Sequence, residues 1–590
     1  MCSIIGIIGQ SVVAPTLVES LKRMEYRGYD SVGVATLSSG SDKISVRKGI
    51  GKVSQVNNNM NLSQMEGLIG IGHTRWATHG GVTDYNAHPH PCCTNDIAVV
   101  HNGIIENYRS LRDELTRRGH RFRSETDTEV ISHLLEENYN ASKDIRSAML
   151  GTVKMLEGSY AFVAMFSNGT LACARLDEPL VIGVSDGAYY ASSDVLGFLQ
   201  HTDQAIFLDN RDIAIIRKEG IEILDFSGNP VTRDATKIAW ELAEANKGEF
   251  AHYTIKEIFE QRTSVKSATY QDEHKLAAFL EPIEKSRNVV VTGSGTSYHT
   301  SLLVSMLGTR LLKKRFEPVM ASEFKYNTES IGPDTAVIAI SQSGETADVL
   351  SAVKQARALG AKILSIVNVS TSSLARSADA SLTINSGPEI GVAATKSFTG
   401  QLALAYTILD RLSRGKLGFD RDDVAAKISG LLAGAENIER LVMSTMPRIR
   451  DMYLLGRSLH FPIALEGALK LKELAYVHAE GIAAGELKHG PLALMDKNAV
   501  VFVINPEDGT YTDMLSSAHE VKARGAKIIG ISNVANDNYD AMIELPTMDN
   551  ELLYPLIEVI PLQLFSYYLA LQNNADPDFP RNLAKSVTVR

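Results

Sequence analysis

The chain has 590 residues, of which 44% are hydrophobic and 22% are charged. A chain of this length does not fold around one core, so about three or four domains are expected. The net charge of −10 gives no general attraction to nucleic-acid phosphates. The one tight basic cluster inside a domain, Lys313–Arg315, is typical of a solvated helix end. The sequence therefore predicts a folded globular protein that does not bind nucleic acid.

The cysteines and the apolar segments indicate the compartment. Four cysteines, at positions 2, 92, 93 and 173, are too few for a disulfide framework, and the adjacent pair lacks the spacing of zinc or redox motifs. The segment Met1–Pro15 contains no Lys or Arg and so lacks the charged start of a signal peptide. No stretch reaches the roughly 18 consecutive apolar residues of a membrane span. We therefore expect a soluble protein of the reducing cytoplasm, without membrane contact.

The N-terminal part of the chain predicts a strand-rich domain, which we place at residues 2–235. Short apolar runs broken by Gly, Asn and Asp predict strands at Ser3–Gly9, Leu68–Gly72, Ile97–Val100, Tyr160–Phe166 and Leu180–Val184. Helical patterns lie between them at Thr16–Met24, Glu106–Arg118 and Thr128–Glu137. The polar, helix-prone stretch that follows, residues 236–274, is predicted to be a linker.

From about residue 275 the pattern changes to strand–loop–helix units, which are typical of parallel α/β layers. The segment Gly360–Val369 (GAKILSIVNV) returns later in the chain as Gly525–Val534 (GAKIIGISNV). Such a repeat predicts two copies of one doubly wound parallel α/β domain. We place the copies at residues 275–420 and 440–575, followed by an ordered tail at residues 576–590.

Cys2 is the first residue in the chain that suggests a catalytic role. Removal of the initiator Met would give Cys2 both a thiol and a free α-amine, which titrates near roughly 8 and can act as an internal base. By itself, a small residue at the start of a strand is more often structural. Three further motifs favour catalysis. The guanidinium of Arg75 can bind a carboxylate through two N–H groups, and Asn102 and Gly103 offer N–H donors for an oxyanion. Asp127 lies where a helix begins, and an ordinary N-cap is the alternative interpretation of that residue.

Together with Glu25–Ser31 and Asn86–His90, these motifs resemble the class II glutamine amidotransferase domain. The resemblance implies an N-terminal-nucleophile fold, an αββα sandwich, with Cys2 as the nucleophile. The glutamine-binding and oxyanion residues that it implies are Arg75, Trp76, Thr78, His79, Asn102, Gly103 and Asp127. Trp76 would also help to close a tunnel for ammonia. His88, His90 and Cys92 could suggest a metal, but prolines hold them in an extended loop and the family needs no metal there, so none is expected.

Two loops in the first repeat predict a phosphate site. Gly293–Ser297 and Ser341–Thr346 each lie between a strand and a helix, where hydroxyls and backbone N–H groups can hold a phosphate. A dinucleotide fingerprint would need Gly in place of Tyr298, and the chain has no P-loop motif, so neither nucleotide cofactor is expected. In the second repeat, Lys470 and Glu473 share one helix face, where a surface ion pair would be the ordinary interpretation.

With the segments Ala484–Leu492 and Arg581–Val589, these motifs resemble the glutamine–fructose-6-phosphate aminotransferase (isomerizing) family nearly end to end. The resemblance implies two sugar isomerase (SIS) domains, a homodimer, no cofactor, and conversion of fructose 6-phosphate and glutamine to glucosamine 6-phosphate and glutamate. Lys585 would form a Schiff base with the sugar, and Glu473 would move a proton between C1 and C2, assisted by Lys470. His489, donated in the family by the neighbouring subunit, would open the sugar ring. The sugar-phosphate-binding residues that it implies are Thr296, Ser297, Ser341, Gln342, Ser343, Thr346 and Val392.

Three positions depart from the family pattern. Ser294 stands where Cys is frequent, Ala394 where Ser is common, and Arg590 where the family commonly ends in Glu. None of the three transfers a proton in the expected mechanism, so they concern the sugar contacts and the tail. An amidotransferase for another acceptor would need a phosphoribosyl-pyrophosphate loop, which is not found. A non-catalytic sugar-phosphate sensor would not need the intact set of proposed catalytic residues.

Overall fold

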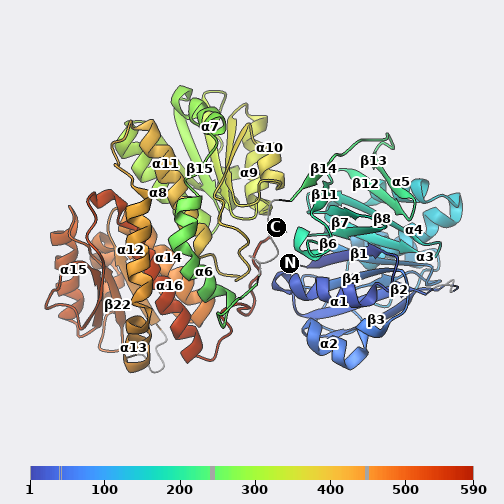
Figure 1. Ribbon diagram of the computed structural model, residues 1–590, viewed down its shortest axis with the longest axis horizontal. Coiled ribbons are helices and arrows are strands. Elements are labelled where there is room, and N and C mark those ends of the chain that lie inside the picture. The colour runs from blue at the N-terminus through green and yellow to red at the C-terminus, as the bar shows by residue number, and fades with distance from the viewer. Residues whose placement is uncertain (1, 39, 41–42, 239–245, 446–450, 589–590) are drawn as a thin grey trace. The chain divides into compact units, whose positions relative to one another are not determined.

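The computed structural model describes residues 2–38, 40, 43–238, 246–445 and 451–588. Residues 239–245 of the expected linker and the departure at Arg590 lie outside the described residues. The chain divides into two compact units, unit 1 (Met1–Leu242 with Ser586–Arg590) and unit 2 (Ala243–Lys585). Figure 1 follows the elements of each unit along the chain.

Unit 1 is built on two antiparallel sheets that pack face to face. Ile4 of β1, Val100 of β6 and Val163 of β7 are buried between the sheets. The eight-stranded sheet has, in spatial order, β14 (Ala235–Lys237), β11 (Gln204–Phe207), β9 (Val181–Ser185), β10 (Ala188–Ser192), β1 (Ser3–Ile8), β4 (Ile69–Arg75), β2 (Ser31–Leu37) and β3 (Ser45–Ile50). The six-stranded sheet has β13 (Gly220–Asp225), β12 (Asp212–Arg217), β8 (Thr170–Leu176), β7 (Gly158–Phe166), β6 (Ile97–Ile105) and β5 (His90–Pro91).

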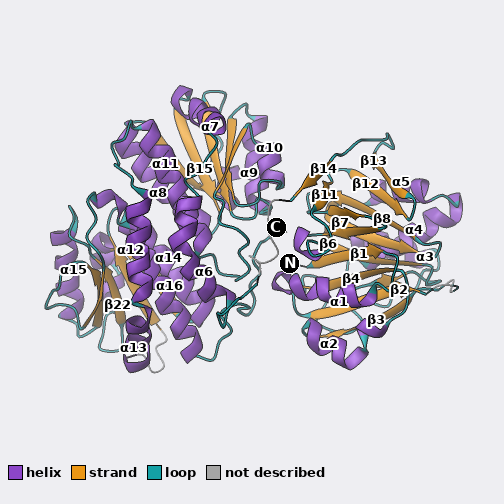
Figure 2. Cartoon of the chain, viewed as in Figure 1, coloured by secondary structure: helices purple, strands orange, loops and turns teal. Residues whose placement is uncertain are grey.

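Helices cover the outer face of each sheet in unit 1 (Figure 2). Leu17 and Leu21 of α1 are buried with Ile5 of β1 on one side, and Leu134 of α4 is buried with Val99 of β6 on the other. The helices are α1 (Ala14–Arg23), α2 (Val53–Met60), α3 (Tyr108–Arg117), α4 (Glu129–Ser142) and α5 (Ile145–Met155). The predicted αββα sandwich is therefore confirmed.

Unit 2 contains two five-stranded parallel sheets with the same strand order. The first is β16 (Arg315–Met320), β15 (Asn288–Gly293), β17 (Thr335–Ser341), β18 (Lys362–Val367) and β19 (Ala380–Thr383). The second is β21 (His478–Ala483), β20 (Asp451–Gly456), β22 (Val500–Ile504), β23 (Lys527–Ser532) and β24 (Ala541–Glu544). In chain order each sheet reads 2-1-3-4-5, a doubly wound arrangement. The repeated segments found in the sequence contain β18 and β23, the fourth strand of each sheet, so the predicted duplication is confirmed.

One continuous core joins the two sheets of unit 2. It runs from Ile338 of β17 through the helices between the sheets to Phe502 of β22. The helices of unit 2 are α6 (Tyr253–Ser267), α7 (Glu273–Lys285), α8 (Thr296–Leu312), α9 (Ala347–Ala358), α10 (Ser373–Ser377), α11 (Lys396–Leu412), α12 (Arg421–Ala433), α13 (Ala435–Thr445), α14 (His460–Ala475), α15 (Tyr511–Lys522) and α16 (Pro555–Gln572). The first and second sheets therefore share one folded body rather than two separate cores.

Two helices of this core differ from what their composition indicates. The stretch expected to be a linker contains α6, whose Ile258 and Val265 are fully buried against α11, α12 and α16. The many polar residues of α6 predicted a linker, although one narrow face of the helix is apolar. The stretch Glu551–Gln572 is long and apolar enough to cross a membrane, although polar residues interrupt its apolar run. However, 94% of its most apolar window is buried inside the protein. Its hydrophobicity matches its place in the core.

Candidate functional site

Cys2 lies immediately before β1, and the groups around it come from distant segments. Trp76 N donates a hydrogen bond to Cys2 Sγ at 3.2 Å, and Asn102 Nδ2 donates to the Cys2 carbonyl at 3.1 Å. Burial raises the pKa of the Cys2 thiol. Because the thiolate is the nucleophilic form, the thiol needs a base before it can attack a substrate.

Asn102 and Gly103 lie near the end of β6, and both are fixed in conformation. Asn102 Oδ1 lies 3.2 Å from His73 Nε2, which also lies 3.0 Å from the carbonyl of His101. Gly103 has a φ of +113°, and a Cβ there would lie 2.1 Å from the carbonyl oxygen of Ser159. Only glycine fits this position, and the Asn102 amide is held with its Nδ2 toward Cys2.

Arg75, at the end of β4, is buried and already makes hydrogen bonds. Its guanidinium donates to the carbonyls of Gly80 at 3.0 Å, Gly81 at 3.0 Å and His79 at 2.5 Å. A guanidinium has more donors than these bonds use, so the arginine can order this loop and still meet a carboxylate. Burial lowers the Arg75 pKa, while the nearby charges of Cys2 and Asp127 raise it. These two predicted residues are therefore electrostatic neighbours of Arg75.

The remaining predicted residues of unit 1 lie in or beside the same loop. The Trp76 ring packs edge-on against Tyr29 with centroids 5.7 Å apart, and the His79 ring packs edge-on against Tyr108 at 5.6 Å. Thr78 lies between them in the chain. Asp127, just before α4, accepts a hydrogen bond from Ile105 N at 2.8 Å, which ties it to the end of β6. The loop after β4, the end of β6 and the start of α4 thus supply all seven residues.

A cluster of buried histidines behind Asn102 was not predicted. The rings of His73 and His88 are stacked with centroids 4.1 Å apart, and His90 packs edge-on against His88. Burial lowers the His73 pKa to about 3 and holds those of His88 and His90 well below their usual value, so these imidazoles are neutral. His90 Nε2 lies 3.2 Å from Thr126 Oγ1. The two histidines considered for a metal are therefore hydrogen-bonded core residues.

In unit 2 the two predicted phosphate loops lie at the switch point of the first sheet. One follows β15 and contains Thr296 and Ser297, the first residues of α8; the other, Ser341–Thr346, joins β17 to α9. In the strand order 2-1-3-4-5, the gap between the first and third strands is where doubly wound proteins bind ligands. The fold thus brings the two loops to one edge, as their matching positions in the sequence predicted.

The longer loop has a tightly defined shape. Ser341 Oγ lies 3.0 Å from Thr346 Oγ1, and Ser343 Oγ accepts a hydrogen bond from Glu345 N at 3.2 Å. Gly344 has a φ of +66°, and a Cβ there would lie 2.0 Å from Ser372 Oγ. The carbonyl of Gln342 accepts from Asn368 N at 3.0 Å, which fixes the loop to the end of β18. The hydroxyls of Ser341 and Thr346 therefore lie side by side within this loop.

Lys470 connects the second repeat to this loop region. Its side chain on α14 is fully buried, and Nζ lies 2.6 Å from Glu473 Oε2, 3.3 Å from Glu466 Oε1 and 3.3 Å from Thr296 Oγ1. Burial acts to lower the Lys470 pKa, but Glu466 and Glu473 outweigh it and the pKa lies above its usual value. The pair is therefore not a surface ion pair, and Lys470 is a fixed cation.

Glu473 is the partly exposed member of that group. It lines a pocket of about 540 Å³ with Tyr476 and with Arg581–Leu583 of the tail. Arg581 N donates to the Tyr476 hydroxyl at 2.7 Å, and its guanidinium lies 4.3 Å from the centre of the Tyr476 ring. The tail is therefore docked against the end of α14, beside the carboxylate predicted to move a proton.

Lys585 is nearly buried, with 5% of its side chain exposed, but it is not an unpaired amine. Its Nζ donates to Glu389 Oε2 at 2.5 Å and to the carbonyl of Gly391 at 2.7 Å. Burial would raise the Glu389 pKa, but the Lys585 charge lowers it to about 2. Val392, the next predicted residue, donates from its N to the carbonyl of Asp578 in the tail at 3.3 Å. The lysine therefore faces a buried carboxylate.

Three carboxylates of unit 2 were missed. Besides Glu389, Glu466 bonds Thr296 and lies 2.7 Å from His299 Nδ1, and Glu257 Oε1 accepts from Gly391 N at 3.1 Å. Burial, reinforced by Glu389, raises the Glu257 pKa to about 8. Each of the three also has a partner more than a hundred positions away in the chain, Thr296 for Glu466, Gly391 for Glu257 and Lys585 for Glu389, and no local motif indicates these contacts.

His489 stands apart from these groups. It is exposed at the end of the short helix η6 (Ala484–His489). Among the described residues, no hydrogen bond or ion pair joins it to Lys470, Glu473 or Lys585. A single chain therefore does not bring this predicted residue to the others by direct contact.

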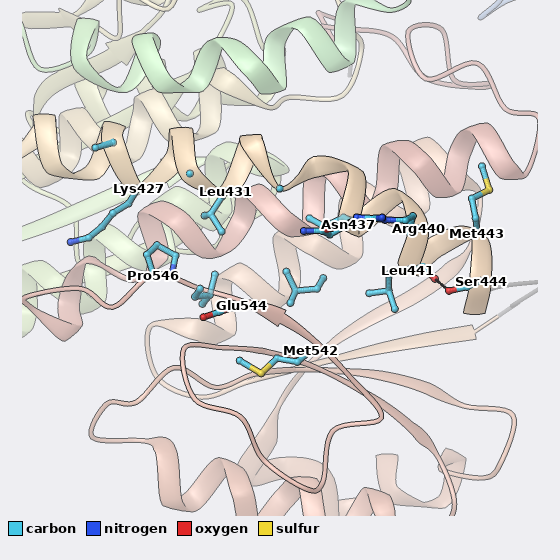
Figure 3. A pocket seen from close by; sticks show the side chains of 16 residues that line it. Lys427, Leu431, Asn437, Arg440, Leu441, Met443, Ser444, Met542, Glu544 and Pro546 are labelled. Carbon is cyan, nitrogen blue, oxygen red and sulfur yellow. Dashed lines mark hydrogen bonds between the residues drawn. The ribbon is translucent and has the colours of Figure 1, made fainter.

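A larger pocket lies elsewhere in unit 2. It measures about 1300 Å³ and contains none of the predicted site residues. Figure 3 shows Leu431 and Leu441 on its helical side and Met542 and Glu544 on its strand side. It lacks the convergent titratable groups of a catalytic site.

Comparisons with known proteins agree with both halves of this arrangement. The model of the glutamine amidotransferase domain matches residues 73–200, and the SIS domain model matches residues 282–411 and 447–572. The chain is 43% identical over 606 residues to the glutamine–fructose-6-phosphate aminotransferase [isomerizing] of Thermococcus kodakarensis and 44% identical over 603 residues to that of Pyrococcus horikoshii. Both matches cover 100% of each chain.

A solved structure extends the comparison to the fold. The C-terminal domain of glucosamine-fructose-6-phosphate aminotransferase from Francisella tularensis matches with a TM-score of 0.52 and 32% identity, over 56% of this chain and 99% of that one. The full-length relatives match across both the glutaminase-type sandwich and the paired parallel sheets. The chain therefore belongs to the family of isomerizing glutamine–fructose-6-phosphate aminotransferases, as its motifs predicted.

Proposed function

We propose that the chain converts D-fructose 6-phosphate and L-glutamine to D-glucosamine 6-phosphate and L-glutamate. The observation that carries the proposal is that one chain combines two sites. Cys2 lies with Asn102 in a glutamine amidotransferase sandwich, and Lys470, which pairs with Glu473, contacts Thr296 at the start of α8 between two SIS-type sheets. The relatives that match along the whole chain carry the name of this reaction.

In the first half-reaction, Cys2 attacks the side-chain carboxamide carbon of glutamine. The α-amine exposed by loss of Met1 takes the thiol proton, which overcomes the raised pKa of the buried thiol. Asn102 and Gly103 donate to the oxyanion, while Arg75 and Asp127 hold the α-carboxylate and the α-amine. Loss of ammonia leaves a thioester on Cys2, and water hydrolyses it to glutamate.

In the second half-reaction, the phosphate of the sugar lies in the loop Ser341–Thr346 and the start of α8. Lys585 loses its proton to solvent, condenses with the C2 carbonyl as the neutral amine and releases water. Ammonia then displaces the lysine and leaves a C2 imine. Glu473 takes a proton from C1 and returns it to C2, while the hydroxyl proton of O1 is transferred to the imine nitrogen; together the two transfers convert the 2-imine into a 2-amino aldehyde. The cation of Lys470, held 2.6 Å from Glu473, keeps that carboxylate oriented.

The ammonia passes between the two sites without entering bulk water, where it would become ammonium and lose its nucleophilic electron pair; Trp76 helps to enclose it. The chain acts as a cytoplasmic homodimer. Support for the dimer comes from His489, which is exposed and has no described contact with Glu473. A second subunit would bring this imidazole to the sugar, where it opens the ring.

The test follows the amide nitrogen. The purified protein is incubated with fructose 6-phosphate and glutamine labelled with ¹⁵N at the amide, and the amino group of glucosamine 6-phosphate is expected to carry the label. Cys2→Ala is expected to lose glutamine hydrolysis and to retain sugar-phosphate binding. A wild-type protein that binds the sugar phosphate and forms no amino sugar would contradict the proposal. Hydrolysis that persists in Cys2→Ala would contradict the role of the nucleophile.

A further inference from the structure

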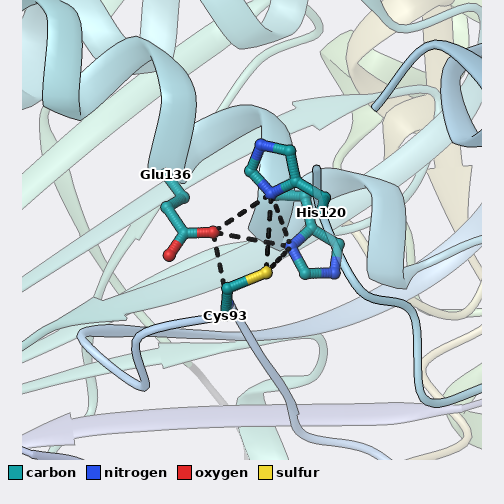
Figure 4. Close-up of side chains that lie close together, drawn as sticks. Cys93, His120 and Glu136 are labelled. Carbon is teal, nitrogen blue, oxygen red and sulfur yellow. Dashed lines mark hydrogen bonds and ion pairs between the residues drawn. The ribbon is translucent and has the colours of Figure 1, made fainter. Parts of the chain in front are cut away.

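Four side chains of unit 1 that take no part in the proposed reaction converge on one point. They are Cys93, which follows β5, His120, which follows α3, and His133 and Glu136 on α4. Their ligand atoms all lie within 4.8 Å of one another. Figure 4 shows the thiol, the imidazoles and the carboxylate turned toward a shared centre.

The spacings match those of a tetrahedral zinc site. Cys93 Sγ lies 3.7 Å from His120 Nδ1 and 3.6 Å from His133 Nδ1, and the two Nδ1 atoms lie 3.2 Å apart. Glu136 Oε2 lies 3.2 Å from His120 Nδ1 and 3.6 Å from His133 Nδ1. Ligands bound tetrahedrally at usual zinc distances stand roughly 3.3–3.6 Å from one another. The four atoms are therefore close to the corners that a zinc ion requires.

A second layer of groups orients these four side chains. His120 Nε2 faces Glu137 Oε1 at 3.4 Å, and His133 Nε2 faces Glu129 Oε1 at 3.6 Å. A carboxylate behind each imidazole is the arrangement that fixes the tautomer of metal-bound histidines, because it keeps the proton on the nitrogen away from the metal. In both residues a proton on Nε2 would face a carboxylate, and Nδ1 would then direct its electron pair at the centre.

The sulfur and the carboxylate are oriented in the same way. Arg121 N donates to Cys93 Sγ at 3.4 Å, and the second oxygen of Glu136 accepts from Thr94 N at 3.0 Å and from Thr94 Oγ1 at 2.9 Å. Glu136 Oε2 thus remains directed at the two histidines. Every proposed ligand is positioned by a neighbour, which is unusual for side chains that meet by chance at a surface.

We propose that Cys93, His120, His133 and Glu136 bind one Zn²⁺ ion. Four protein ligands complete a tetrahedron and leave no open position, so the site is structural rather than catalytic. The ion ties the turn between β5 and β6, the loop after α3 and the helix α4 together. The ligands are 27, 13 and 3 positions apart, which explains why no compact zinc motif is visible in the sequence.

The experiment uses the full-length protein and Zn²⁺ itself. After exposure to one equivalent of Zn²⁺ and gel filtration, the wild type is expected to retain about one zinc ion per chain. Cys93→Ser is expected to bind zinc at least tenfold more weakly, because it loses the thiolate ligand. Cys92→Ser is the matched control: this neighbouring thiol lies outside the cluster, and its variant is expected to bind as the wild type does. Glu137→Gln, which changes the layer behind His120 and also removes the ion pair with Arg118, is expected to weaken binding roughly 10–100-fold.

Cobalt substitution identifies the ligands directly. The Co²⁺ form of the wild type and of Cys92→Ser is expected to show a sulfur-to-cobalt charge-transfer band that Cys93→Ser lacks. Circular dichroism establishes that each variant is folded, and His120→Asn serves as a second ligand variant if Cys93→Ser fails to fold. A wild type that retains no zinc, which is the result expected of a purely ionic cluster, overturns the proposal. Equal zinc affinity in the wild type and in folded ligand variants overturns it as well.

Discussion

The two parallel sheets of unit 2 have the same strand order, yet the loops at their switch points carry different chemistry. In the first copy, the loops after β15 and β17 present the hydroxyls of Thr296, Ser343 and Thr346. In the second copy, the corresponding loops after β20 and β22 present Arg457 and Asp508. The duplicated scaffold is shared, and the difference is confined to a few side chains at the same edge.

Ion pairs occupy the second switch point. Asp508 accepts hydrogen bonds from Thr510 N and Thr510 Oγ1, both at 2.8 Å, and lies 2.8 Å from His460 Nε2. Arg457 pairs with Asp513 at 2.8 Å. A carboxylate therefore sits at the helix start where the first copy offers hydroxyls, and it would repel a phosphate. The second copy instead supplies α14, whose Lys470 pairs with Glu473 and reaches Thr296 of the first copy. Duplication kept the fold, and the functions of the two copies diverged through their loops.

The largest expected effect concerns the helix that the second copy supplies. Glu473→Gln keeps the shape of the side chain and removes the base, so kcat for glucosamine 6-phosphate formation is expected to fall roughly 10²–10⁴-fold. Sugar-phosphate affinity and glutamine hydrolysis are expected to change little. Glu480→Gln, a change at an exposed glutamate on the neighbouring strand β21, is the control. Steady-state kinetics with both substrates measure kcat. A normal kcat in Glu473→Gln would show that α14 has no catalytic role.

The next largest expected effect is on sugar-phosphate affinity and concerns the loop Ser341–Thr346 of the first copy. The double change Ser343→Ala and Thr346→Ala removes two hydroxyls that can donate to a phosphate, each worth about 1.5–3 kcal/mol when the acceptor is charged. Affinity for fructose 6-phosphate is expected to fall at least tenfold, as measured by calorimetry. Thr510→Ala, in the equivalent loop of the second copy, is expected to leave that affinity unchanged. A comparable loss in Thr510→Ala would mean that both switch points bind the sugar.

Local sequence patterns predicted the two parallel sheets and the position of their loops well. The repeated strand segments predicted two copies of one sheet, and Gly293–Ser297 and Ser341–Thr346 predicted where loops would meet, because strand–loop–helix order fixes which edge a loop occupies. The αββα sandwich followed from resemblance to a known family. The roles of Cys2 and Lys585 likewise rest on that resemblance and stay predictions, since local sequence says only that the residue types are suitable.

Long-range partners could not be predicted. Glu389 lies 196 positions before Lys585, and Glu466 lies 170 positions after Thr296, so nothing near either residue in the sequence indicates the contact. The buried segment α6 was missed for a related reason: polar residues dominate its composition, while only a few apolar side chains, among them Ile255, Ile258 and Val265, lie in the core. In each case the missing information is which distant surface covers the residue, and that depends on the packing of the whole unit.

The smallest expected effect concerns the ion pairs of the second copy and depends on pH. His460 lies 2.8 Å from Asp508 and 2.7 Å from Glu558, and although burial acts to lower the His460 pKa, these two carboxylates raise it to about 10. A folded-state pKa above the unfolded value of about 6.5 stabilises the fold fully below pH 6.5, and the stabilisation is lost as pH rises toward 10. The wild type is therefore expected to exceed His460→Gln in Tm most below pH 6.5, with a difference that shrinks steadily toward pH 10. Thermal unfolding at several pH values measures that difference, at roughly 2–4 °C for each kcal/mol. A difference that stays constant over this range would mean that His460 is neutral, and the second switch point would then not be held by a buried charge.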